Sequence, residues 1–354
     1  MGGAARRPGT EVHSGTPGPP GVSREAAEVH AAAPVVDLHC DAILQWRWLR
    51  ADLSRRHRGN PLPSSPGMGH TDFPRLREGG VAVVTLGIPA PVVNAVDGPG
   101  VAEQMMLAAH AAMARDGRTR VLGTDEDPLQ AKSQGELRAV FAIEGAHLVG
   151  FDLSVLPVWR SLGLRMVGPA HLLPNVACTP SSSPSGASKP LTRYGRALVE
   201  AVGSNGLVLD LAHMNRRGFD EALEIHDGPV MVSHTGIAGA HPLWRNVSDE
   251  QAMAIAERDG VIGIIFFPAF LRGSLSGSVE DVVDHVEAAA AVVGPDHVSI
   301  GTDFDGSITI PREMRRGAAD LMLLTDAMLR RGIPAEDCVK ILGSNALRVL
   351  RRAG

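Results

Sequence analysis

Histidine and acidic side chains recur in this sequence directly after short apolar runs. His39 and Asp41 end VVDLHCD, and Glu144 ends AVFAIE. His213 closes LVLDLAH, and His234 closes VMVSH. Imidazole and carboxylate ligands without a thiolate suit zinc, and manganese, cobalt or iron can use the same set. The sequence therefore predicts a metal centre built from these five residues.

The five residues fall into two ligand pairs and one bridging group. His39 and Asp41 are two residues apart on an extended segment, so both side chains point the same way. We expect this pair to bind one ion and the pair His213 and His234 to bind a second. Glu144 has two carboxylate oxygens and can bridge the ions. Two such ions, about 3.5–4 Å apart, polarise a carbonyl and supply a metal-bridging hydroxide near neutral pH, which is hydrolysis chemistry.

Each polar residue has a plain explanation when it is considered alone. A histidine after an apolar strand is usually a hydrogen-bonded rim residue, and the Asp303–Phe304–Asp305 segment is usually a turn or a helix cap. Seven such residues at strand ends are harder to explain in this way: His39, Asp41, Glu144, His171, His213, His234 and Asp303. Packing carboxylates and imidazoles together is costly unless a cation offsets the charge.

The elements that position these residues are eight short apolar runs separated by helix-like segments. The runs cover residues 35–39, 81–86, 139–143, 164–167, 207–211, 230–233, 261–266 and 298–301. Buried strands that alternate with helices indicate a parallel sheet covered by helices. Eight units favour an α/β fold of the closed (β/α)8 TIM-barrel type over an open doubly wound sheet, and no glycine-rich dinucleotide fingerprint follows the first run. The metal centre is then expected at the carboxyl ends of the strands.

Two long polar segments and two C-terminal helices complete the expected fold. The segments Arg50–Thr71 and Leu172–Pro190 follow the first and fourth runs, where a barrel places its catalytic end. They are candidates for a lid or for specificity, and the first can equally be a surface insertion. Residues 318–331 read as a helix, and residues 335–351 as one closing helix.

The composition limits the class of protein. The chain has 354 residues, 44% of them apolar, and a net charge of -5, which excludes a strongly basic nucleic-acid binder. Its three cysteines are too scattered for a disulfide framework, and alternation along the first run turns Cys40 away from the metal ligands. Residues 1–22 are rich in glycine and proline and are expected to be a disordered tail before a barrel domain of residues 23–354. Without a signal peptide or a membrane span, a cytoplasmic location is expected.

Six segments together resemble the membrane (renal) dipeptidase family of zinc peptidases. They are VVDLHCD, FAIEGAH, GLVLDLAH, VMVSHTG, HPLWRNVSDEQ and IGTDFDG, in the same order from about Val29 to the end. The resemblance implies a (β/α)8 barrel with two Zn²⁺ per protomer, usually a homodimer, acting on small dipeptides.

The resemblance also implies roles for individual residues. His39 and Asp41 match the ligands of one zinc, His213 and His234 match those of the other, and Glu144 matches the bridge. Asp303 matches the acid/base that moves the proton from water to the leaving nitrogen. His171 matches the residue that stabilises the oxyanion. Arg245 matches the arginine that binds the substrate carboxylate.

Departures from the family pattern concern the substrate. Leu172 stands where the family commonly has asparagine, and the segment FFPAF (Phe266, Phe267 and Phe270) lacks the usual tyrosine hydroxyl. The leading hypothesis is a zinc dipeptidase for L-Xaa-L/D-Xaa substrates. The altered segments leave open a specialised amide or lactam hydrolase that acts on a modified peptide or conjugate in a biosynthetic pathway. A third reading is a metal-binding barrel without catalytic activity.

Overall fold

The computed structural model describes residues 19–59, 66–90, 98–184 and 188–353. The expected N-terminal tail therefore lies outside the described residues as far as residue 18. The described chain begins with a turn, closed by a hydrogen bond from the Val22 amide to the Pro19 carbonyl (3.3 Å), and enters helix α1 (Arg24–Ala32). Ser23 caps this helix, because its side chain accepts a hydrogen bond from the Ala26 amide.

Eight parallel strands close into a barrel. They are β1 (Val36–Cys40), β2 (Val83–Pro89), β4 (Leu137–Glu144), β5 (Leu164–Gly168), β6 (Val208–Asp210), β7 (Val230–Thr235), β8 (Val261–Ile264) and β9 (Val298–Ile300). The sheet closes because β2 pairs with both β1 and β4, while β1 also pairs with β9. The predicted (β/α)8 barrel is confirmed. A short further strand, β3 (Thr119–Val121), pairs in parallel with the first residues of β4 and was not predicted.

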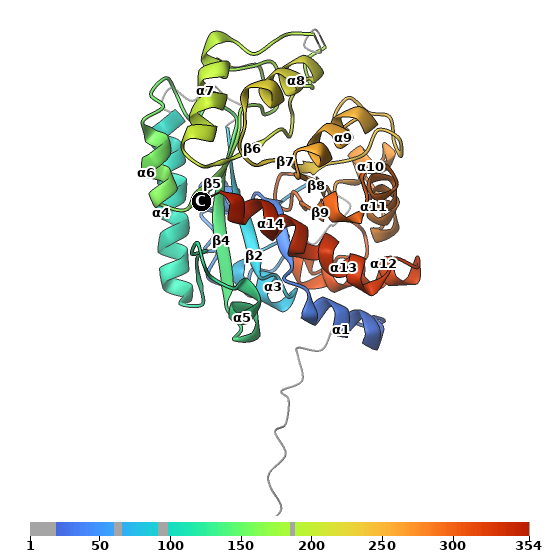
Figure 1. Ribbon diagram of the computed structural model, residues 1–354. Helices are drawn as coiled ribbons and strands as arrows, with labels where there is room; N and C mark the ends of the chain where they lie inside the picture. Colours follow the sequence, from blue (N-terminus) through green and yellow to red (C-terminus); the bar gives the residue numbers. More distant parts are fainter. Residues whose placement is uncertain (1–18, 60–65, 91–97, 185–187, 354) are drawn as a thin grey trace, which may run out of the picture.

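Helices form the outer layer of the barrel (Figure 1). They are α2 (Ile43–Leu49), α3 (Phe73–Glu78), α4 (Gly98–Asp116), α5 (Pro128–Ser133), α6 (Val155–Ser161), α7 (Arg193–Ser204), α8 (Arg216–Ile225), α9 (Asp249–Glu257), α10 (Pro268–Arg272), α11 (Val279–Val293) and α12 (Met322–Arg330), with 3₁₀ turns η1 (Pro295–His297) and η2 (Gly317–Asp320). Thr192, Asn215 and Ser248 cap α7, α8 and α9 through their side-chain oxygens, which fixes where each helix begins.

The predicted closing helix is interrupted at its centre. It consists of α13 (Ala335–Val339), a π-helical turn η3 (Lys340–Ser344) and α14 (Asn345–Arg352). Gly343 lies in the π turn against the Pro34 carbonyl, where a Cβ atom would come within 2.0 Å of the oxygen. Leu347 and Leu350 of α14 pack with Val36 and Met231 from the barrel interior. Helix α14 therefore fills one end of the barrel (Figure 1), which leaves the carboxyl ends of the strands for the site.

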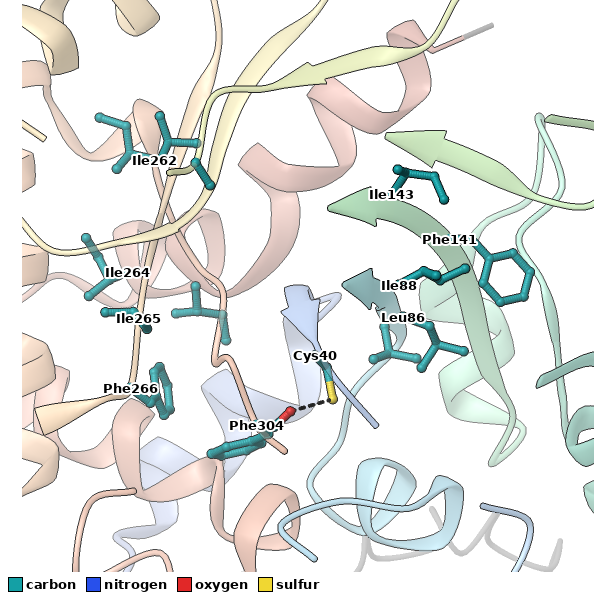
Figure 2. Close-up of a cluster of buried hydrophobic side chains, with 14 of the residues drawn as sticks. Cys40, Leu86, Ile88, Phe141, Ile143, Ile262, Ile264, Ile265, Phe266 and Phe304 are labelled. Atoms are coloured by element: carbon teal, nitrogen blue, oxygen red, sulfur yellow. Dashed lines mark hydrogen bonds between the residues drawn. The ribbon is translucent and has the colours of Figure 1, made fainter. Parts of the chain in front are cut away.

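Side chains that face outward from the strands form the larger core, between the barrel and the helices. Figure 2 shows part of it, where Leu86 and Phe141 belong to one side of the barrel and Phe266 and Phe304 to the other. The Cys40 thiol lies in this core, 3.6 Å from the Phe304 carbonyl oxygen, so the prediction that it packs away from the ligands is confirmed. Within the described ranges, no helix is both long enough and apolar enough to cross a membrane.

Candidate metal centre

The five predicted ligands meet at the carboxyl ends of the strands. His213 Nε2 lies 2.9 Å from Oε1 of Glu144, and His234 Nε2 lies 3.5 Å from the same oxygen. On the other side, His39 Nε2 lies 3.7 Å from Oε2 of Glu144 and 3.4 Å from Oδ1 of Asp41. Glu144 thus has one histidine pair at one oxygen and His39 at the other. This is the arrangement expected of a bridging carboxylate between two ions.

Several ligand atoms of this cluster are buried without a hydrogen-bond partner. They are both ring nitrogens of His39, Oδ1 of Asp41, Oε2 of Glu144 and Nδ1 of His213. Leaving a buried polar atom unpaired costs about 1–3 kcal/mol, so a cluster of them calls for a bound cation. Three sets of ligand atoms each lie within 4.8 Å of one another: His39, His234 and Asp303; Glu144, His171 and His213; His39, Asp41 and Glu144. The residues present therefore fit a site for bound metal.

Burial and crowded charge shift the pKa values of the cluster. Burial lowers the pKa of His39, but the surrounding carboxylates, Glu144 first, outweigh it and raise that pKa to about 10. Burial, and then the charge of Asp41, raises the pKa of Asp303 well above its usual value. Burial lowers the pKa of His213 to about 3. A bound cation would favour carboxylates without protons and neutral imidazoles, the forms that bind metals.

Irregular backbone at the strand ends orients the side chains of the candidate ligands. The register of β1 slips by one residue between Asp37 and Cys40, and that of β7 slips between Val232 and Thr235. These bulges contain His39 and His234 respectively, and a bulge is a common means of redirecting a side chain near a site. His213 and Asp303 follow their strands with φ of 62° and 59°, a region that residues other than glycine rarely adopt.

A buried carboxylate fastens each bulge. Asp37 Oδ1 accepts hydrogen bonds from the amides of His39 (3.2 Å) and Thr302 (2.8 Å). Asp210 Oδ1 accepts one from the Ser233 amide (2.9 Å). Burial raises the pKa of Asp37 to about 6 and also raises that of Asp210. No role for Asp37 was predicted from the sequence, although a carboxylate inside the apolar run VVDLH is a signal that could have indicated one.

The three residues assigned by resemblance lie at the same cluster. Asp303 Oδ1 is 4.0 Å from His39 Nε2. His171 Nε2 is 3.6 Å from Oε2 of Glu144, while its Nδ1 lies 3.2 Å from the Ala90 carbonyl oxygen. Arg245 is buried, donates from Nη2 to the His234 carbonyl (2.8 Å) and keeps Nε without a partner. The structure therefore brings together all eight site residues predicted from the sequence.

The segment that lacks the family tyrosine packs as an aromatic cluster. Phe266 is fully buried, with its ring centre 5.7 Å from that of Phe304. Phe267 and Phe270 pack against each other, with their ring centres 4.9 Å apart. The Arg245 guanidinium carbon lies 5.9 Å from the Phe270 ring centre, so an apolar face occupies the space beside this cation.

Asp305 has a structural task that sequence reasoning did not assign. Its Oδ1 accepts hydrogen bonds from the amides of Gly69 and His70, both at 2.7 Å, and its Oδ2 accepts one from Gln45 Nε2 at 2.7 Å. The bonds from Gly69 and His70 tie the C-terminal end of the Arg50–Thr71 segment to the strand end that carries Asp303. The segment Leu172–Pro190 is also held at this rim, because the Ser181 amide donates to the His213 carbonyl (2.8 Å).

The fold and the cluster define a (β/α)8-barrel hydrolase built to hold metal ions. Residues 23–354 match the family described as membrane dipeptidase (peptidase family M19). The chain belongs to this family of metal-dependent peptide-bond hydrolases, so the resemblance noted in the sequence is confirmed.

Named relatives agree with this assignment. The dipeptidase tcpJ of Claviceps purpurea is 32% identical over 64% of this chain, and the alignment spans 53%, about half, of that protein. The dipeptidase aclJ of Aspergillus oryzae is 27% identical over 91% of this chain and 79% of its own length. A metallo peptidase from Rhodobacter sphaeroides, solved with a phosphinate mimic of the dipeptide L-Ala-D-Ala, is 28% identical over 91% of this chain and 99% of that one, with a TM-score of 0.79.

Proposed function

We propose that this chain is a dipeptidase that uses two zinc ions to hydrolyse the amide bond of small dipeptides with a free C-terminal carboxylate. The observation that carries the proposal is the placement of Arg245 beside the cluster of buried ligand atoms. The cluster supplies hydrolytic chemistry, and the unpartnered Nε of a buried arginine supplies a carboxylate-binding group at the same place.

In this proposal His39 and Asp41 would hold one ion, His213 and His234 would hold the other, and Glu144 would serve both. Bound zinc supplies Lewis acidity for the scissile carbonyl and a hydroxide near neutral pH. Glu144 can serve both sides, because His213 Nε2 lies close to one of its oxygens and His39 Nε2 faces the other.

The remaining side chains bind the substrate and move its proton. Arg245 would bind the terminal carboxylate, which fixes the peptide bond relative to the cluster. His171 Nε2 would donate a hydrogen bond to the oxygen that develops negative charge. Asp303 would accept a proton from the attacking water at its carboxylate and pass it to the leaving amine nitrogen.

A ligand bound to a structurally similar protein supports the proposed substrate class. The structurally similar peptidase from Rhodobacter sphaeroides was solved with a mimic of L-Ala-D-Ala, which supports tolerance of a D-residue at the C-terminal position. Zinc as the metal, a homodimer and a cytoplasmic location stay predictions from the sequence.

The direct test is hydrolysis of a dipeptide panel. Protein loaded with zinc is incubated with L-Xaa-L-Xaa and L-Xaa-D-Xaa dipeptides, and the released amino acids are quantified. We expect turnover of at least some members and loss of turnover when the terminal carboxylate is amidated. A chain with both ions bound that cleaves no member of the panel would overturn the proposal.

A further inference from the structure

A pocket of about 190 Å³ lies directly beside the metal cluster. His213 of the cluster and Arg245 beside it form part of the pocket wall, so the pocket and the proposed reaction site adjoin each other. Ser181 from the Leu172–Pro190 segment also lines it. The apolar part of the wall comprises Leu211, Met214, Phe219, Val232, Trp244 and Val247, and the polar part includes Asn215, Asn246 and Gln251.

The charge of this pocket is positive. Its lining residues include two arginines and no carboxylate. Arg216 is already paired, since its Nε lies 3.2 Å from Asp220 and its Nη1 lies 3.6 Å from Glu250. Arg245 has no such carboxylate partner and is almost entirely buried, at 3% exposure. The charge that is free to meet a ligand is therefore that of Arg245, next to an apolar wall.

Trp244 forms an exposed part of the wall. Trp244 is 49% exposed, although it directly precedes the buried Arg245. Its ring centre lies 5.9 Å from that of Phe270 in a T-shaped arrangement. An aromatic surface beside an unpaired cation suits a ligand that carries both an anionic group and an apolar body. An amino acid with an apolar side chain and a free carboxylate has this combination.

We propose that this pocket receives the side chain of the C-terminal residue of the substrate while Arg245 holds its carboxylate. The inference rests on the proposed dipeptidase function and names its substrate class, namely dipeptides that end in a sizeable apolar residue such as leucine or phenylalanine. A glycine leaves the apolar part of the wall without contacts, whereas a larger apolar side chain loses contact with water there.

Steady-state kinetics with a series of L-Ala-Xaa dipeptides test this inference. Xaa is glycine, alanine, leucine, phenylalanine or glutamate, in both L and D forms. Since one methylene in an apolar pocket is worth about tenfold or more in kcat/KM, we expect the leucine substrate to exceed the glycine substrate by at least about tenfold. Trp244→Ala removes part of the wall and is expected to lower this leucine-to-glycine ratio several-fold.

Two further variants separate the pocket from general damage. Ser181→Phe fills part of the pocket from the Leu172–Pro190 segment and should also lower the leucine-to-glycine ratio. The hydrogen bond from the Ser181 amide to the His213 carbonyl does not involve the side chain, so it should keep the new ring at the pocket. Trp48→Ala is the matched control: Trp48 is similarly exposed, at 52%, lies on α2 and does not line the pocket, so the ratio should not change.

The kinetic results separate the pocket assignment from the dipeptidase proposal. Turnover of every dipeptide with no preference for leucine over glycine overturns the pocket assignment and leaves the dipeptidase proposal standing. A preference that neither Trp244→Ala nor Ser181→Phe alters also overturns the pocket assignment. Absence of turnover for the whole series overturns both proposals.

Discussion

Oγ of Ser233 lies 2.8 Å from Nδ1 of its neighbour His234, and both side chains are buried. The contact fixes the ring so that Nε2 faces Glu144 and His213. Asp210 in turn accepts a hydrogen bond from the Ser233 amide. A partner on the far nitrogen of a metal-binding histidine sets its tautomer and orientation. Ser233 therefore positions His234 for the role that we propose.

Ser233→Ala should weaken binding of the second zinc ion about 10–100-fold, because His234 loses the group that orients it. The measurement is a zinc titration against a chelating dye, independent of activity. Ser299→Ala is the matched control, since Ser299 is a buried serine on β9 whose hydroxyl has no hydrogen-bond partner. Equal zinc affinities in the two variants would contradict the positioning role.

Asp303→Asn should lower kcat by about 10²–10⁴-fold while both ions remain bound, because it removes the proton acceptor and keeps the shape. Asparagine also tolerates the positive φ of 59° at this position, so the backbone should not be strained. Metal content, melting temperature and kcat are measured on one sample. Near-normal turnover in the fully loaded variant would rule out the acid/base role.

Arg245→Lys should raise KM for dipeptides about tenfold or more, with a smaller change in kcat. Lysine keeps the positive charge and loses the planar fork that binds a carboxylate through two hydrogen bonds. In the original chain the buried Nε of Arg245 has no hydrogen-bond partner, and lysine cannot replace this donor. The comparison uses dipeptides and their C-terminal amides, and an equal KM change for both would count against carboxylate binding.

Folding stability should fall in mild acid through His30. Its Nδ1 lies 2.7 Å from the Thr325 hydroxyl and its Nε2 lies 2.8 Å from the Gly79 carbonyl, so the neutral ring fits both partners. Burial lowers its pKa from 6.5 to about 4. The unfolded chain then binds more protons, and the contribution of His30 to stability is complete above pH 6.5 and is lost progressively toward pH 4.

The gap of about 2.5 pKa units sets an upper limit of about 3 kcal/mol on this loss. Urea unfolding between pH 7.5 and pH 4.5 measures it. His30→Gln should be less stable at pH 7.5 and show a shallower pH dependence than the original chain. Parallel pH profiles for the two proteins would exclude His30 as the source.

The strands and the gathering of the candidate ligands could be predicted because both leave a local signal in the sequence. Each barrel strand is a short apolar run, and residues such as Glu144 and His234 follow such runs directly, so the closed barrel gathers them at one rim. Strand β3 was not predicted because its sequence, TRV, is not an apolar run and the side chain of Arg120 at its centre is exposed. The π turn around Gly343 also leaves no periodic signal, since it depends on the close approach of Pro34.

The residues that support the ligands were less predictable because their partners are remote in sequence. Asp305 binds the His70 amide, 235 residues away, and Asp37 binds Thr302, 265 residues away. A single sequence shows that such carboxylates exist but not which amides they meet. Ser233 is recognisable only once the bulge in β7 places its hydroxyl beside His234.

We expect this rim to hold two metal ions, one of them through His213 and His234. Zinc stoichiometry, measured by mass spectrometry of the loaded and desalted protein, tests it most directly. The original chain should hold two ions, and His213→Asn should hold one, because asparagine accepts the φ of 62° at this position and is a poor zinc ligand. Fewer than two ions in the original chain, or two tightly held ions in His213→Asn, would show that this assignment of the ligands is wrong.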